Sequence, residues 1–427
     1  MGRDAIPAAR GPALRLGGLR RRRLVAAVAP DLAAAWRAFW VSRLVVWASG
    51  LGAIAIWGLQ EAHKRAFDPA GLTRPFGAFG DLLVAPGARW DAVWFLAIAH
   101  GGYATDARAA FFPTYPLLVR AVGGVFGSPL VAALLVSCIA FLVALAAFHR
   151  LAVIEVGADA ARWAVPALAL FPGAVWFSSA YSESLFLALS VGAVLAARTG
   201  RWGWAGVLGA GAAATRSAGV VLLVPLALLW WDARRQGAAG ARQLACVAIV
   251  PAGLALFCAG LALGGHAADA PFSAQDVWHR SFAGPLAGVA DAAVAAWDGA
   301  RQVLSGSTTP VYFTKAAGDP IEVGRHNMML FGFLLLTVPM VLGALRRLPL
   351  AHGAYAVAAL ALPLSFPVTP QPLMSLPRFL AVLYPLFLWQ GWWLARGGPQ
   401  RRALALGAAA LGLAVFSALA STWHWVA

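Results

Sequence analysis

Charged residues are scarce in this sequence. They make up 12% of its 427 positions, about half the fraction typical of a soluble globular domain, whereas hydrophobic residues make up 61%. Apolar stretches long enough to cross a bilayer recur from about residue 35 to the C-terminus. This composition excludes a water-soluble globular protein. It predicts an all-α, multi-pass integral membrane protein with about 10–11 transmembrane helices.

Cysteine is also rare. The sequence contains Cys138, Cys246 and Cys258, and each of them lies inside an apolar stretch. Buried free cysteines behave as small hydrophobic side chains. The sequence shows neither a metal-ligand spacing nor a disulfide framework. We therefore expect no obligatory cofactor, and nothing in the sequence demands a divalent metal.

Acidic residues are few relative to basic ones. The 17 Asp and Glu against 33 Lys and Arg give a formal net charge of +16. Nucleic-acid binding is one explanation of such a charge, but the arginines lie in short runs between apolar spans, as they do in the cytoplasmic loops of membrane proteins. The Arg- and Ala-rich composition favours a bacterial source. We therefore expect a bacterial plasma membrane protein without a nucleic-acid partner.

The basic cluster Arg20–Arg23 precedes the first apolar span. By the positive-inside rule, this cluster places the N-terminus in the cytoplasm. The sequence therefore divides into a basic cytoplasmic tail, residues 1–34, and a single transmembrane domain, residues 35–427.

Two long loops are predicted on the outer side, at about residues 60–128 and 265–326. Within the first loop, residues 111–126 are expected to form an amphipathic helix along the membrane interface. Residues 203–232 are too long for one simple crossing, so we predict two short helices with an outward-facing turn at Thr215–Ser217. This division places the arginine clusters of the later loops on the N-terminal side.

Asp91 is the first candidate for chemistry. It belongs to the run Arg89-Trp90-Asp91, and apolar residues at helical spacing follow it, so it lies at or near a helix N-terminus. An acid there is favoured by the helix dipole and could simply cap the helix. The alternative is catalysis, in which the carboxylate acts as general base on an acceptor hydroxyl.

Three more charged residues are predicted on the same outer side: Glu183, Arg216 and Arg378. An ionisable residue at membrane depth is a functional hypothesis by default. Arg216 interrupts an apolar hairpin, and either Glu183 or a substrate phosphate would explain it. Arg378 has the wrong sign for a helix N-terminus, which indicates a nearby anion, whereas snorkelling to the interface is the alternative. Such a set suits group transfer from a membrane-held phosphate.

The sequence resembles the PIG-V-like mannosyltransferases, relatives of the second mannosyltransferase of GPI-anchor synthesis in the GT-C superfamily. The matching pieces occur in family order, and the segment from Phe171 to Pro225 is the strongest. The pieces are Trp90-Asp91-Ala92, Phe111-Phe112-Pro113, Tyr181-Ser182-Glu183, Thr215-Arg216-Ser217, Phe272 with Gln275, and Pro377-Arg378-Phe379.

The resemblance implies a GT-C-like bundle whose large first outer loop carries the catalytic acid and interfacial helices. It implies that Asp91 is the catalytic residue. The residues it places in substrate binding are Arg89, Trp90, Tyr181, Glu183, Arg216, Gln275 and Arg378.

The same resemblance implies transfer of mannose, with inversion, from polyprenyl-phosphate-mannose to an acceptor hydroxyl on the extracytoplasmic side. The partners would be the lipid bilayer, the lipid-linked donor, and a glycan, glycolipid or protein acceptor.

Other function classes remain open. A GT-C enzyme with another lipid-linked sugar is one, because only the resemblance argues for mannose. A secondary transporter or lipid flippase is another, although transporters tend to have paired halves with matching broken helices, and only residues 203–232 show such a break. A non-catalytic subunit of a glycosylation complex is the third.

Overall fold

The computed structural model of the chain describes residues 20–58, 68, 70–313 and 318–426. Residues 1–19 of the predicted tail and 59–67 near the start of the first predicted outer loop lie outside the described residues. Residues 20–34, predicted as tail, instead form the first turns of α1, Arg20–Trp57. The second half of the predicted tail is therefore helical, whereas the part of α1 apolar enough to cross a membrane begins at Pro30, and the division into tail and transmembrane domain stays a prediction.

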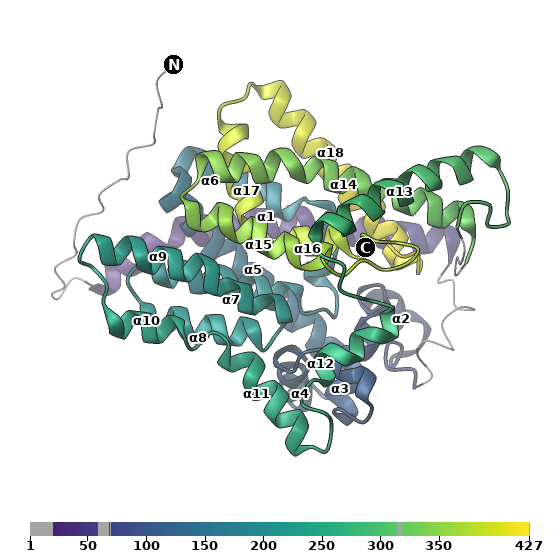
Figure 1. The fold of residues 1–427 in the computed structure, drawn as a ribbon, viewed down its shortest axis with the longest axis horizontal. Coiled ribbons are helices and arrows are strands. Elements are labelled where there is room, and N and C mark those ends of the chain that lie inside the picture. Colours follow the sequence, from purple (N-terminus) through teal and green to yellow (C-terminus); the bar gives the residue numbers. More distant parts are fainter. Residues whose placement is uncertain (1–19, 59–67, 69, 314–317, 427) are drawn as a thin grey trace.

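The described part of the chain is helical throughout and contains no strand, only a single bridge between Arg280 and Val368 (Figure 1). The next elements along the chain, with η marking 3-10 helices, are α2 (Gly77–Val84), η2 (Ala85–Gly87), α3 (Ala92–Gly101), η3 (Asp106–Ala110), α4 (Thr114–Phe126), α5 (Pro129–Val156), α6 (Ala158–Ala169), η4 (Pro172–Ser178), α7 (Glu183–Arg198), α8 (Trp202–Ala213), η5 (Ser217–Leu222) and α9 (Leu223–Arg235). They are followed by α10 (Ala241–Val247), α11 (Ala252–Leu263), α12 (Ala270–Ser273), η6 (Ala274–Trp278), α13 (Pro285–Ser305), α14 (Pro320–Arg347), α15 (Leu350–Leu364), α16 (Leu376–Ala381), α17 (Tyr384–Ala395) and α18 (Pro399–Ser421).

Five helical segments in the described residues are long and apolar enough to cross a membrane, and three bent helix pairs raise the number to eight. The prediction of an all-α, multi-pass membrane protein is confirmed. The predicted 10–11 spans exceed this number because several of them are short helices: α7, α15 and α17 contain 16, 15 and 12 residues.

The predicted break in residues 203–232 is present. Helix α8 ends at Ala213, and η5 and α9 follow it. Three further breaks were not predicted: the helical segment Phe79–Gly87 and α3 are bent by 104°, α6 and η4 by 75°, and α10 and α11 by 45°. Proline lies at the last two breaks, as Pro172 and Pro251, where the residue before proline is disfavoured in helical conformation.

The predicted outer loops contain ordered helices. The expected helix at residues 111–126 is confirmed as α4, and α3 and α4 gather with α11 and α12 at one corner of the bundle (lower right in Figure 1). The 21-residue helix α13 was missed inside the second predicted loop. Helix α13 packs closely against α14 at Gly299. A Cβ atom added to Gly299 would lie only 2.6 Å from the carbonyl oxygen of Gly324, so the two backbones approach too closely there for a larger residue.

The polar residues of interest and the arginine clusters lie at opposite ends of the helices. Helix α7 begins at Glu183 and ends at Arg198, and α14 begins near Glu322 and ends at Arg346 and Arg347. The arginines at the end of α9 lie on the same side as Arg198. One end of the bundle therefore carries the basic clusters and the other carries the candidate site.

Candidate active site

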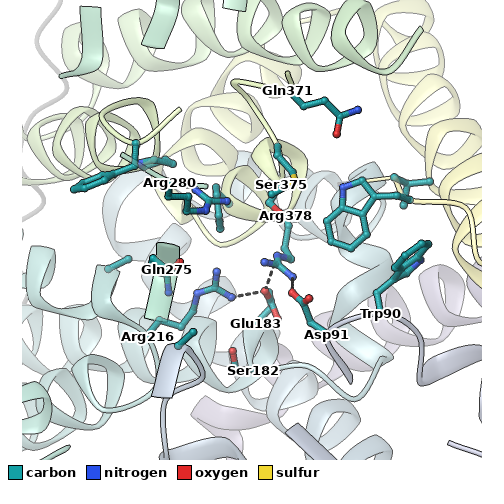
Figure 2. A pocket seen from close by; sticks show the side chains of 18 of the residues that line it. Trp90, Asp91, Ser182, Glu183, Arg216, Gln275, Arg280, Gln371, Ser375 and Arg378 are labelled. Carbon is teal, nitrogen blue, oxygen red and sulfur yellow. Dashed lines mark hydrogen bonds and ion pairs between the residues drawn. The ribbon is translucent and has the colours of Figure 1, made fainter. Parts of the chain in front are cut away.

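A cavity of about 1540 Å³ opens at the end of the bundle where α7 begins and α15 ends. Its wall comes from the first predicted outer loop, η5, η6, α14, α16 and the segment after α18. Figure 2 shows how side chains from these separate segments point toward one another. Six predicted site residues line it: Trp90, Asp91, Glu183, Arg216, Gln275 and Arg378.

Asp91 directly precedes α3 but does not cap it, because its side chain makes no hydrogen bond to the helix N-terminus. Arg378 Nη1 instead donates to Asp91 Oδ2 at 2.5 Å (Figure 2). The capping interpretation of Asp91 is therefore wrong. Snorkelling is wrong for Arg378, whose side chain is only 11% exposed, and the predicted nearby anion is the Asp91 carboxylate.

Glu183, at the first position of α7, joins the two arginines. Its Oε1 accepts a hydrogen bond from Arg216 Nη1 and lies 3.2 Å from Arg378 Nε. The prediction that Glu183 could be the partner of Arg216 is confirmed. The Glu183 side chain is 1% exposed, and its Oε2 accepts no hydrogen bond within the described residues.

These four side chains form one ion-pair cluster, which we call the acid–arginine cluster: Asp91, Glu183, Arg216 and Arg378. Two carboxylates and two guanidinium groups balance each other. Burial of such charges costs several kcal/mol per ion unless each of them is paired. The cluster is therefore a set of charges held in place before any ligand binds.

The turn that presents Asp91 is strained. Trp90 has a φ of 54°, in the left-handed region that bulky residues rarely adopt, at a cost of about 1–3 kcal/mol. The hydroxyl of the buried Tyr181 bridges this turn, because it donates to the Arg89 carbonyl oxygen at 3.0 Å and accepts from the Asp91 backbone N–H at 3.1 Å. Tyr181 therefore clamps both sides of Trp90.

Arg89 and Tyr181 were predicted to bind substrate, but neither is among the residues that line the cavity. Both are buried beneath its wall. Arg89 Nε donates to the Ser421 carbonyl oxygen, and its guanidinium lies 4.9 Å from the Trp423 ring. In the structure Tyr181 contacts the turn at Asp91 and Arg89 contacts the segment after α18, and their role in substrate binding stays a prediction.

The segment after α18 was missed by sequence reasoning. Thr422, Trp423, His424 and Trp425 line the cavity. Trp90 packs edge-to-face against Trp423 and Trp425, with ring centroids 5.7 and 5.4 Å apart. The predicted binding residue Trp90 thus belongs to an aromatic wall beside Asp91.

Arg280 was also missed. It lies on the cavity wall between η6 and α13, and Gln275 of η6 lies on the same wall (Figure 2). Burial, helped by the charges of Arg378 and Arg216, lowers the pKa of Arg280 to about 10, so it stays protonated at neutral pH. Arg280 lies outside the arginine clusters that were predicted to be cytoplasmic. The same observation drew attention to Arg216 in the sequence, and it would also have identified Arg280.

No group of three or more His, Cys, Asp or Glu side chains in the described ranges is placed to hold a metal ion.

Part of this chain is similar to a family of known proteins. The family model described as "Mannosyltransferase (PIG-V)" matches residues 63–230. The chain is 35% identical over 180 residues to GPI alpha-1,6-mannosyltransferase 2 of Rattus norvegicus, and 35% over 182 residues to that of Mus musculus. It is 31% identical over 179 residues to the protein of that name from Homo sapiens.

These matches cover 38–39% of this chain and 36% of each relative, so the chain matches little more than one third of the relatives' length. The segment matched by the family model contains Asp91, Glu183 and Arg216, whereas Gln275 and Arg378 lie beyond it. The predicted resemblance is confirmed: over residues 63–230, this chain is similar to the PIG-V mannosyltransferases.

Proposed function

We propose that this chain is a membrane mannosyltransferase that moves mannose from polyprenyl-phosphate-mannose to an acceptor hydroxyl, with inversion at the anomeric carbon. The observation that carries the proposal is the pairing of Asp91 with Arg378 inside a large cavity at one end of a membrane bundle. Similarity to PIG-V mannosyltransferases supports the choice of mannose.

In this mechanism the acceptor oxygen attacks the anomeric carbon of mannose while the bond from that carbon to the phosphate oxygen breaks. The acceptor proton passes to the Asp91 carboxylate, which acts as general base. Polyprenyl phosphate leaves from the opposite face of the sugar and takes the bonding electrons. Attack and departure on opposite faces produce inversion.

The acid–arginine cluster suits the charge changes of this reaction. When Asp91 accepts the proton, its carboxylate becomes neutral and no longer balances Arg378. The phosphate simultaneously changes from a diester with one negative charge to a monoester with two. The positive charge released at Arg378 can therefore stabilise the leaving group at the moment that its charge grows.

The cavity is expected to face the extracytoplasmic side. The basic clusters at Arg198, Arg234–Arg235 and Arg346–Arg347 occupy the opposite helix ends, and positive charge marks the cytoplasmic side of membrane proteins. Access from the outer leaflet suits a lipid-linked donor together with a glycan, glycolipid or protein acceptor.

The test is a transfer assay with purified protein reconstituted in lipid vesicles. Polyprenyl phosphate carrying radiolabelled mannose is supplied with a membrane extract as acceptor, with and without EDTA, and the labelled products are separated. We expect label to leave the lipid donor for a new product in wild type, and not in Asp91→Asn. Label that crosses the vesicle membrane without entering a new product would overturn the proposal and indicate a transporter.

A further inference from the structure

We infer that Arg280 binds the phosphate of the lipid-linked donor. We infer also that the exposed phenylalanine side chains Phe272 and Phe282, which line the same cavity, receive the first part of the lipid chain. This inference rests on the proposed function, and it names the residue that recognises the phosphate of the donor. Arg280 lies outside the segment that is similar to the PIG-V proteins.

The first support is the charge on the cavity wall. Arg216 and Arg378 are already paired with Glu183 and Asp91. Arg280 makes no ion pair with any carboxylate of the described residues, although its guanidinium faces the same cavity. The acid–arginine cluster is neutral, so Arg280 adds one positive charge next to it, and the other charged residues of the lining are Asp276, Asp319, Glu322 and Arg325. A donor phosphodiester carries one negative charge and would match the charge of Arg280.

The second support is geometry around Phe379. The Arg280 guanidinium carbon lies 6.0 Å from the centre of the Phe379 ring. The same ring has Arg216 at 5.5 Å and Arg378 at 5.7 Å. Three guanidinium groups from separate segments thus surround one side chain. A phosphate bound at Arg280 would lie near Arg378, which gains free charge when Asp91 is protonated.

The third support is how firmly Arg280 is held. Its backbone forms a bridge with Val368, and the Ala283 backbone N–H donates to the Ser365 carbonyl oxygen at 2.9 Å. These contacts attach the segment before α13 to the segment after α15. The backbone that carries Arg280 is therefore held in place before any ligand binds, which lowers the entropic cost of binding.

Exposed phenylalanine side chains on the cavity wall favour a lipid phosphate over free phosphate as the ligand of Arg280. Phe282 lines the cavity, is 74% exposed, and lies edge-to-face with Phe366 at 5.5 Å. Phe272, 52% exposed, lines the same cavity. Exposed apolar surface next to a partly buried cation suits a ligand with a phosphate head and a hydrocarbon tail.

The test measures binding separately from transfer. Farnesyl phosphate, farnesol and inorganic phosphate are titrated against wild type, Arg280→Gln, Arg280→Lys and the control Arg301→Gln, and affinity is read from tryptophan fluorescence and from the shift in Tm. Arg301 lies on α13, is 45% exposed and pairs with Asp298, away from the cavity lining.

We expect farnesyl phosphate to bind wild type and Arg301→Gln equally, and Arg280→Gln about tenfold to hundredfold more weakly, since a charge-assisted contact is lost. The affinity of Arg280→Lys for farnesyl phosphate should lie between those of wild type and Arg280→Gln. Lysine keeps the positive charge but lacks the planar guanidinium that donates two hydrogen bonds to one phosphate. Farnesol binding should be unaffected by Arg280→Gln. The Tm and circular dichroism of each variant without ligand show that it is folded.

Unchanged farnesyl phosphate affinity in folded Arg280→Gln overturns the assignment of Arg280. Inorganic phosphate that binds as well as farnesyl phosphate overturns the lipid part. If wild type transfers mannose and Arg280→Gln keeps its affinity for the donor, this inference fails and the proposed function stands. If wild type binds farnesyl phosphate through Arg280 but transfers no mannose, the proposed function fails and the phosphate site stands.

Discussion

Arg378 Nη1 lies 2.5 Å from Asp91 Oδ2, although the two residues are 287 positions apart in the chain. The contact joins the residue before α3, in the first predicted outer loop, to α16 near the other end of the sequence. It holds the carboxylate at the cavity wall and keeps it away from the N–H groups of α3. The contact thus connects the fold of the whole bundle to the position of the proposed general base.

Asp91→Asn tests the base directly. The amide keeps the shape of the side chain but cannot accept the acceptor's proton. We expect the transfer rate to fall about 10²- to 10⁴-fold, with little change in KM for the donor. The measurement is steady-state transfer kinetics on protein matched for amount and Tm.

Asp159→Asn is the matched control for this substitution. Asp159 is 88% exposed, pairs only with its helix neighbour Arg162, and lies at the start of α6. It should transfer mannose at the wild-type rate. Full activity in a normally folded Asp91→Asn variant would contradict the assignment of Asp91.

Glu183→Gln tests the centre of the acid–arginine cluster. The substitution leaves Arg216 and Arg378 with less counter-charge in a buried site. Loss of one partner from a buried ion pair destabilises a protein by about 3–5 kcal/mol. We expect a clear fall in Tm and in transfer rate, and the measurement is thermal unfolding in detergent together with the transfer assay.

A double-mutant cycle then isolates the interaction. Glu183→Gln and Arg216→Gln combined should destabilise less than the two single changes added together. Asp298→Asn and Arg301→Gln form the control cycle, because that exposed pair on α13 should couple by only about 0–1 kcal/mol. Additive effects at Glu183 and Arg216 would show that the pair does not act as a unit.

Tyr181→Phe tests the clamp on the strained turn at Trp90. The change removes the hydroxyl that bonds the Arg89 carbonyl oxygen and the Asp91 N–H, and leaves both of them without that partner. We expect a loss of about 1–3 kcal/mol in the free energy of unfolding. The transfer rate should fall while donor KM changes little, because Asp91 is displaced and no donor contact is removed.

The control for Tyr181→Phe is Tyr312→Phe. The Tyr312 ring packs against Arg301 away from the cavity lining, with 4.0 Å between ring centre and guanidinium. That variant should keep wild-type kinetics. If Tyr181→Phe lowers only the affinity for donor, Tyr181 contacts substrate after all and the positional role is wrong.

The sequence predicted the members of the site better than their contacts. The Glu183–Arg216 pair was foreseen as one of two explanations, because a buried arginine needs an anion. The positive charge of Arg378 at a helix start indicated a nearby anion. That this anion is the Asp91 carboxylate depends on how α16 packs beside the first predicted outer loop. Contacts between distant segments are set by tertiary packing, which short-range patterns do not report.

Two misses have different physical causes. Helix α13 lacks the long apolar run that marks a membrane span, although its alanines favour helix, so its charged residues made it resemble a loop. The left-handed conformation of Trp90 has no local signal at all, because the Tyr181 hydroxyl, 90 positions away from Asp91, bridges the residues on either side of it. Strain of this kind becomes visible only in the folded structure.

His266 is expected to make the stability of the contact between η3 and the segment after α11 depend on pH. Its Nδ1 lies 2.7 Å from Asp106 Oδ1, and its Nε2 lies 2.8 Å from the Tyr103 carbonyl oxygen. Both oxygens are acceptors, so both hydrogen bonds form only when the imidazole is doubly protonated. The bond to Asp106, followed by the bond to Tyr103, raises the pKa of His266 above its ordinary value of 6.5.

A raised pKa in the folded state means that protonated His266 stabilises the fold. This contribution is fully present below pH 6.5, the ordinary value, and is lost as pH rises through the raised folded-state pKa. We expect the Tm of wild type to fall through this window, relative to His266→Gln, whose side chain does not titrate there. Asp106→Asn should narrow the pH range over which this stability is lost. The Asp106 carboxylate is the largest cause of the raised His266 pKa, so its removal brings the folded-state pKa closer to 6.5. If wild type and His266→Gln lose stability in parallel as the pH rises, the contact between η3 and the segment after α11 is not protonation-dependent.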